Sequence, residues 1–230
     1  FDDEKGITHT TQHLRLNIHR LEKGLLALRP KEVFATGFIE DTLDCYERAL
    51  QRNGAGSPCE LQWAHDVLTR YFDTVSSHPV VDRARARFSA IQPVAGDDVA
   101  HAPYLRSQSR PSPVCYDDLM ALAQRRRSVR WYLRRPVPRE LLDQAMLIAA
   151  LSPSGCNLQP FEFRILDDPR LIAAMAPLAP GIGSFADNLP VLVALVGKMR
   201  ALSNCERERH RIYVDASLAA MSFMYALETL

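Results

Sequence analysis

Residues 152–163 read SPSGCNLQPFEF and lie between a predicted helix and a predicted strand. Pro153 and Pro160 frame a short run of small and polar residues, so the loop is rigid and lets a ligand approach its backbone closely. The amides of Asn157 and Gln159 offer both donors and acceptors, which suits the edge of a heterocycle. An ordinary helix-to-strand connection is the alternative, because loops are commonly rich in these residues.

A second stretch, residues 125–135, reads RRRSVRWYLRR in a chain of 230 residues whose formal net charge is only +1. Such a basic run can bind nucleic acid, cradle one cofactor phosphate, or form a solvated helix end. The chain has 28 Lys and Arg against 27 Asp and Glu, and this balance argues against a dedicated nucleic-acid binder. Arg126, Ser128 and Arg130 alternate, so in an extended segment their side chains point the same way. The other arginines are expected to be solvated or paired with acids.

Composition places the chain among globular proteins, with 47% hydrophobic and 24% charged residues. Its five cysteines are widely spaced and include no C-x-x-C pair, which argues against a disulfide framework and favours a reducing compartment. No signal-peptide pattern is found, so we predict a cytoplasmic protein. The most apolar long segment, residues 212–227, is shorter than a membrane span and contains Asp215, which predicts a buried core helix and no membrane partner.

Metal ligands show no convincing pattern in the sequence. His9 and His13 lie four residues apart, a spacing that could share an ion, but no Cys, Asp or Glu pattern completes the site. We therefore predict no metal site.

Three regions follow from the order of predicted elements. Residues 1–91 read as helices separated by Pro and Gly breakers, and residues 92–113 carry four prolines with few large apolar residues, which is typical of a linker. Residues 114–230 mix helices with strands near 161–166 and 191–196. This organisation predicts an α+β fold preceded by an all-helical region.

Together, the two motifs resemble the nitroreductase family of flavoproteins. The family pattern is R-R-S-x-R-aromatic, then a helix opening near proline, then P-S-x-x-N-x-Q-P-aromatic leading into a strand. Residues 126–131 and 153–161 follow this pattern in the same order, and the match covers roughly residues 115–230. Phe161 stands where Trp is common, which preserves an aromatic residue. The resemblance implies a nitroreductase-like fold with a mixed sheet flanked by helices.

By this resemblance, residues 114–230 form an FMN-binding domain. In the family the central helix continues into further strands and helices, so we expect the C-terminal part of the fold to be missing here. The arginine motif would bind the FMN phosphate and the ribityl or pyrimidine side, while the loop would line the isoalloxazine ring. The candidate cofactor-binding residues are Arg126, Ser128, Arg130, Pro153, Ser154, Gly155, Asn157 and Gln159.

The implied activity is hydride transfer from NADH or NADPH through FMN to a small-molecule electron acceptor, such as a nitroaromatic, a quinone, an enone or a biosynthetic intermediate. No catalytic side chain is required, because the flavin carries the chemistry. The family's central helix packs across a homodimer interface with FMN between the subunits, so a homodimer is implied as well. The alternative is a non-catalytic flavin-binding or scaffold protein that assembles through its N-terminal helices.

Overall fold

The computed structural model describes residues 2–51, 58–92, 101–202 and 205–230. The chain forms two compact units, one of residues 1–110 with 156–158, and one of residues 111–155 with 159–230. The boundary between the units falls inside the predicted linker at 92–113, of which residues 93–100 lie outside the described residues. We keep the three-region division as a proposal.

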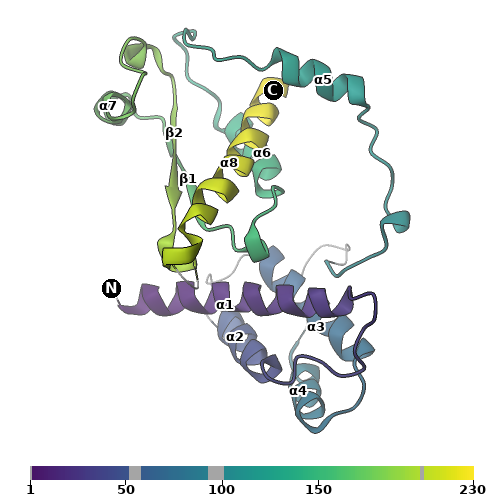
Figure 1. Cartoon of the computed structure of the whole chain (residues 1–230). Helices are drawn as coiled ribbons and strands as arrows, with labels where there is room; N and C mark the ends of the chain where they lie inside the picture. The colour runs from purple at the N-terminus through teal and green to yellow at the C-terminus, as the bar shows by residue number, and fades with distance from the viewer. Residues whose placement is uncertain (1, 52–57, 93–100, 203–204) are drawn as a thin grey trace. The chain divides into compact units, whose positions relative to one another are not determined.

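Helices build the first unit, as the sequence predicts (Figure 1). Apolar residues of α1 at a spacing of three and four, such as Leu14, Ile18 and Leu21, are almost fully buried in a shared core with the other helices. This burial confirms the helical N-terminal region. Its described helices are α1 (Asp2–Leu25), α2 (Ile39–Gln51), α3 (Pro58–Thr74) and α4 (Pro79–Ser89).

Gly24, near the end of α1, allows the segment that leads to α2 to pack closely against the helix. A Cβ atom on Gly24 would lie 2.2 Å from the ring of Phe34, so only glycine lets the connection to α2 approach α1 this closely. Tyr71 of α3 then fixes the connection, because its hydroxyl donates to the carbonyl of Phe34 at 2.7 Å. The close approach at Gly24 and the hydrogen bond of Tyr71 thus fix the segment between α1 and α2 within the first unit.

Helices and one small sheet form the second unit, which confirms the α+β class (Figure 1). Strands β1 (Phe161–Leu166) and β2 (Leu192–Gly197) pair antiparallel, with Phe161 opposite Gly197 and Leu166 opposite Leu192. The expected mixture of parallel and antiparallel strands does not occur in the described part of the chain, because only these two strands form there. The helices beside them are α5 (Tyr116–Arg125), α6 (Arg139–Ala150), α7 (Pro169–Met175) and α8 (Cys205–Thr229).

One face of α8 packs against α6 and the sheet. Ala145 and Ala149 of α6 meet Phe223 and Ala226 of α8, so small residues allow the two helix backbones to come close. The opposite face of α8 is exposed: its large apolar side chains there are Tyr213, Val214, Leu218 and Met224. The prediction of a buried core helix at 212–227 is therefore correct for one face only, because α6 and the sheet cover a single side of it.

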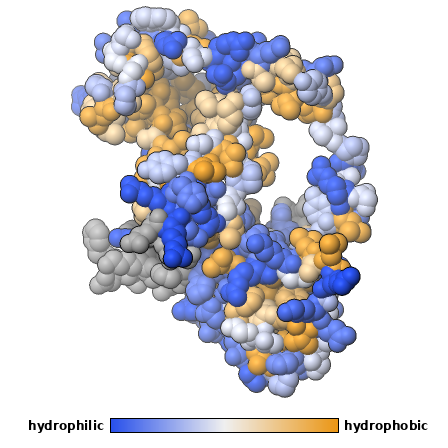
Figure 2. Space-filling model, in the orientation of Figure 1, coloured by the Kyte–Doolittle hydropathy of each residue, from blue (hydrophilic) through white to orange (hydrophobic). Residues whose placement is uncertain are grey.

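Apolar residues also reach the surface elsewhere, as the orange areas of Figure 2 show. In the described parts of the chain, no helix combines the length and the apolar character needed to cross a membrane.

Candidate functional site

The 152–160 loop joins α6 to β1 and is fixed to α8, which confirms the predicted helix-loop-strand order. The buried Ser152 donates its hydroxyl to Ser222 Oγ at 2.7 Å. The backbone N–H of Gly155 donates to Asp215 Oδ2 at 3.1 Å. Asp215 is 6% exposed, so this charge-assisted bond gives the buried carboxylate a partner and holds the loop at a defined point of α8.

Sequence reasoning identified the loop but missed its attachment point. The available signal was a lone acid, Asp215, on an otherwise apolar helix, because such a residue needs a partner when it is buried. Only the fold identifies that partner as a backbone amide 60 residues earlier in the chain.

The loop holds an unusual backbone shape. Cys156, Asn157 and Gln159 all have positive φ, at 52°, 52° and 45°, a region in which side chains other than Gly, Asn and Asp are uncommon. Hydrogen bonds within the loop compensate: the N–H of Gln159 donates to Ser154 Oγ at 3.0 Å, and its side-chain amide donates to the carbonyl of Ala150 at 3.1 Å. Backbone strain of this kind persists only where the surroundings determine the conformation, and it often marks ligand-binding segments.

The polar groups of the loop therefore have two roles. Ser154 and Gln159 satisfy the backbone locally, which is the role that the ordinary-connection alternative assigns to them. Asn157 is exposed at a turn and offers its amide to solvent. Gly155 is half-buried, and a Cβ atom there would lie 2.1 Å from the guanidinium of Arg211. Pro153 is exposed at the start of the loop.

The arginine motif follows directly after α5. The N–H of Arg126 caps the helix by donating to the carbonyl of Leu122 at 3.1 Å, and from there the chain leaves the helix. Arg126 is half-buried, whereas Ser128 and Arg130 are exposed. Asn188 also fixes this segment, because its side-chain amide donates to the carbonyl of Arg130 at 3.1 Å.

The arginines near this motif differ in their partners. Arg125 forms an ion pair with Glu228 at 2.8 Å, and Arg139 forms one with Asp143 at 2.9 Å. Among the residues that the structure describes, no carboxylate pairs with Arg126 or Arg130. The two guanidiniums that the sequence selects thus keep their charge available for an anion.

Within one chain, the two motifs meet different parts of α8. The loop bonds Asp215, and the residue just before the arginine motif bonds Glu228, 13 residues further along the helix. That spacing corresponds to about 20 Å along a helix axis. Figure 1 shows the end of α5 beside the C-terminal end of α8. Within this chain, the two motifs are therefore attached to α8 at points well separated along the helix.

A surface pocket of about 540 Å³ lies immediately after the arginine motif. Its lining includes Arg134, Arg135, Ile172, Asp187 and Asn188. Asn188 lines this pocket and also donates a hydrogen bond to the carbonyl of Arg130, so the pocket adjoins the arginine motif. Sequence reasoning assigned Arg134 and Arg135 to the solvated surface, and nothing in their spacing indicated a pocket.

Comparison with known proteins supports the resemblance. The model of the nitroreductase family matches residues 123–182, a range that contains both motifs. An NADH dehydrogenase of Thermus thermophilus is 32% identical over 94 residues, which is 40% of this chain and 45% of that protein. An iodotyrosine deiodinase of Haliscomenobacter hydrossis is 28% identical over 82 residues, 35% of this chain and 37% of that protein. The chain thus spans less than half the length of these curated relatives.

Solved structures of similar proteins include a nitroreductase family protein of Streptococcus pneumoniae, with 21% identity and a TM-score of 0.40 over 48% of this chain and 72% of that one. Another is a Desulfovibrio desulfuricans nitroreductase in complex with FMN, with 21% identity and a TM-score of 0.40 over 51% of this chain and 63% of that one. With the family match over residues 123–182, the resemblance of this chain to the nitroreductase family is confirmed.

Proposed function

We propose that this protein is an FMN-dependent oxidoreductase of the nitroreductase type, which passes hydride from NADH or NADPH through the flavin to a small organic acceptor. The observation that carries the proposal is the family match over residues 123–182, because this range contains both candidate cofactor-binding motifs. The names of the two curated relatives, a dehydrogenase and a deiodinase, agree with redox chemistry.

The residues present fit a flavin mononucleotide. Arg126 and Arg130 carry permanent charge and pair with no carboxylate in the part of the chain that the structure describes, which suits a phosphate dianion. Ser128 lies exposed between them and can donate its hydroxyl to the same group. The loop presents the exposed amide of Asn157 on a rigid, hydrogen-bonded backbone, which suits the polar edge of a ring system.

When it is bound, the flavin supplies the hydride chemistry, and this chain supplies binding and orientation. Arg126 and Arg130 hold the phosphate end. The loop fixes the ring end, because Asp215 and Ser222 tie it to α8. A rigid loop keeps the reacting edge of the ring at one angle to the acceptor, which is the usual protein contribution in such sites.

We further propose that each site is shared between two protomers of a homodimer. A cofactor held by both motifs of one chain would have to run along about half of α8, whereas a second copy can supply the loop from the other side. The exposed apolar face of α8 gives a surface for this contact, since contiguous apolar surface commonly marks an interface.

A cytoplasmic location is also proposed. Among the described residues, Cys45, Cys59 and Cys115 form no disulfide, which agrees with a reducing compartment. We propose no nucleic-acid partner, because the total charge is nearly balanced.

The visible absorption spectrum of the full chain, before and after FMN reconstitution and anaerobic addition of NADH or NADPH, tests the activity. We expect a yellow protein whose flavin bands are bleached by the nicotinamide. A yellow protein that no nicotinamide bleaches would favour the non-catalytic flavin-binding alternative. A protein that takes up no FMN contradicts both flavin-binding hypotheses and favours a scaffold protein that assembles through its N-terminal helices.

Complementation between two variants tests the shared site. Arg130→Gln weakens the phosphate end, and Asn157→Gly removes the loop amide while keeping a residue that tolerates positive φ. Each homodimer should be impaired at both sites. A mixed dimer, co-expressed with two affinity tags, should regain one intact site if each site draws on both protomers. A mixed dimer as impaired as the two parents would show that each chain builds its own site.

A further inference from the structure

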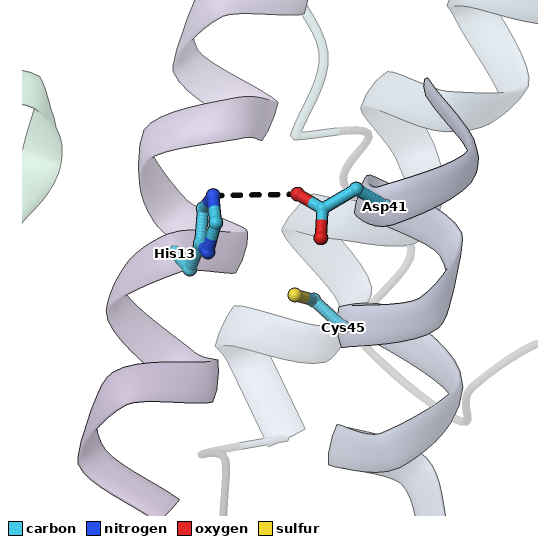
Figure 3. Close-up of side chains that lie close together, drawn as sticks. All are labelled: His13, Asp41 and Cys45. Carbon is cyan, nitrogen blue, oxygen red and sulfur yellow. Dashed lines mark ion pairs between the residues drawn. The ribbon is translucent and has the colours of Figure 1, made fainter. Parts of the chain in front are cut away.

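Three side chains with metal-ligand atoms converge between α1 and α2 of the first unit (Figure 3). His13 extends from α1, while Asp41 and Cys45 extend from α2 one helical turn apart. Their donor atoms all lie within 4.8 Å of one another, and His13 Nε2 lies 3.3 Å from Asp41 Oδ2. None of these residues belongs to the proposed flavin site.

We propose that His13, Asp41 and Cys45 bind one zinc-like divalent transition-metal ion, with water as the remaining ligand. Imidazole nitrogen, carboxylate oxygen and thiolate sulfur are the donors that zinc uses in proteins. The sulfur also selects against magnesium and calcium, which prefer oxygen ligands alone. Three protein ligands and an open position are the arrangement of a four-coordinate site accessible to solvent.

The geometry needs only a small closure. Zinc bonds of about 2.0–2.3 Å in a tetrahedral arrangement place donor atoms roughly 3.3–3.8 Å apart. The distance between His13 and Asp41 already has this value. Any remaining gap to Cys45 Sγ is at most about 1 Å, which a rotation of the exposed His13 side chain can reduce.

Neighbouring side chains already orient two of the ligands. The amide of Asn17 donates to Asp41 Oδ2 at 3.1 Å, and its own oxygen accepts from Arg20 at 3.1 Å. Asn17 is fully buried, so it fixes the carboxylate from inside the helix pair. The guanidinium of Arg48 lies 3.8 Å from Cys45 Sγ and favours a negative sulfur. Outer contacts of this kind orient metal ligands and tune their basicity.

The three proposed ligands differ in burial: Cys45 lies in the core, whereas His13 and Asp41 face solvent. Cys45 is 2% exposed, whereas the side chains of His13 and Asp41 are 43% and 47% exposed, so an ion can enter from solvent. Burial, and secondly the nearby Asp41 carboxylate, raises the pKa of the Cys45 thiol. A bound dication deprotonates a coordinating thiol, and the two resulting negative ligands balance its charge.

The competing interpretation needs no metal: His13 and Asp41 form an ion pair, and Cys45 is a packing residue of the core. The two interpretations differ in what the sulfur does. Only a metal site makes the sulfur of Cys45, together with His13 and Asp41, necessary for binding an added ion. Such an ion would link α1 to α2 and stabilise the first unit in proportion to its concentration.

Titration of the metal-free full chain with Co²⁺ tests the proposal. We expect saturation at one ion per chain, with a sulfur-to-cobalt charge-transfer band and the visible bands of tetrahedral cobalt, which Zn²⁺ then displaces. Cys45→Ser should abolish the charge-transfer band, whereas Cys59→Ser, a change at an exposed cysteine of the same unit, should keep it. A band that is absent, or that depends on Cys59, overturns the proposal.

Two further variants keep the test valid if Cys45→Ser does not fold. His13→Gln and Asp41→Asn change exposed side chains, and each should weaken Zn²⁺ binding by at least about tenfold, a loss that even outer-shell changes cause. Circular dichroism should show unchanged helix content in both. X-ray absorption at the zinc edge of the unaltered protein should report one sulfur among nitrogen and oxygen neighbours. Unchanged affinity in both variants, or a sulfur-free zinc shell, contradicts the site.

Discussion

The two units bury their apolar residues to very different degrees. In the first unit, large side chains such as Ile39, Leu43, Tyr46 and Leu68 are completely buried in one core. In the second, the largest buried cluster is built mainly from alanines, and large side chains such as Leu147 and Leu218 are exposed. The first unit thus gains stability from its own packing, whereas the second has an apolar face of α8 that a partner protomer is proposed to cover.

Polar contacts follow the same division. In the first unit, Arg15 pairs with the buried Glu60 at 2.7 Å, and the indole of Trp63 donates to Glu22 at 2.8 Å, so these contacts tie α1 to α3. In the second unit, the notable polar contact is that of Gly155 with Asp215, which positions a loop. Polar groups therefore connect packed helices in one unit and position a loop in the other.

Truncation of a core residue in the first unit should have the largest effect. Leu43→Ala leaves a cavity in a fully buried position and should cost about 2–5 kcal/mol of unfolding free energy. Urea unfolding followed by Trp63 fluorescence in a Trp131→Phe background measures the first unit alone, because these are the two tryptophans of the chain. The comparison between units fails if Leu43→Ala costs less than about 1 kcal/mol.

Loss of one arginine of the proposed phosphate-binding pair should have the next largest effect. Arg126→Gln should lower FMN affinity by roughly tenfold to a hundredfold, since hydrogen bonds to charged groups contribute about 1.5–3 kcal/mol. Arg139→Gln is the matched control, because Arg139 carries the same charge but is paired with Asp143. Fluorescence titration of FMN measures both affinities. Equal losses in the two variants would assign the effect to general charge.

Alkaline pH should destabilise the first unit through Tyr71. Burial raises the pKa of Tyr71 to about 12, whereas an exposed tyrosine in the unfolded chain ionises near 10. The unfolded state therefore loses its proton first, and stability is retained below pH 10 and falls by about 2 kcal/mol as the pH rises to 12.

The control for this pH effect is Tyr71→Phe, which removes the ionising group along with its bond to Phe34. Its stability should start lower and decline less steeply between pH 10 and 12, as measured by urea unfolding at each pH. An identical slope in the variant and the unaltered protein would assign the decline to other groups.

The smallest effect on folding stability should come from the exposed face of α8. Leu218→Ser should change the unfolding free energy by no more than about 0.5 kcal/mol, because the side chain is 44% exposed. It should nevertheless weaken self-association, which analytical ultracentrifugation measures. Unchanged self-association would show that this face is not the dimer contact. The proposal that a partner protomer covers the exposed apolar face of α8 would then be wrong.

Local patterns were enough to predict much of this protein. Three-and-four spacing of Leu14, Ile18 and Leu21 predicts the helical first region, and turn residues around 152–160 predict the change from helix to strand. The resemblance to the nitroreductase family likewise depends on short motifs, each read along the chain. These features are local because hydrogen bonding and side-chain period are set by neighbouring residues.

Other features depended on contacts between distant segments. Asp41 and Cys45 lie four residues apart in the sequence, a spacing that by itself does not indicate a metal site. Only the packing of α2 on α1 brings them close to His13. The exposed side of α8 was predicted to be buried, because an apolar pattern reports which residues avoid water but does not report what covers them.

By itself, the sequence determined the α+β class, the helical first region and the two motifs, because each is encoded by residues close together in the chain. The tertiary structure alone decided that Asp215 anchors the loop, that the two motifs meet α8 at points about 20 Å apart, and that His13 faces Asp41 and Cys45. Those relations depend on which helix faces pack together, and that packing is set by the whole core of each unit.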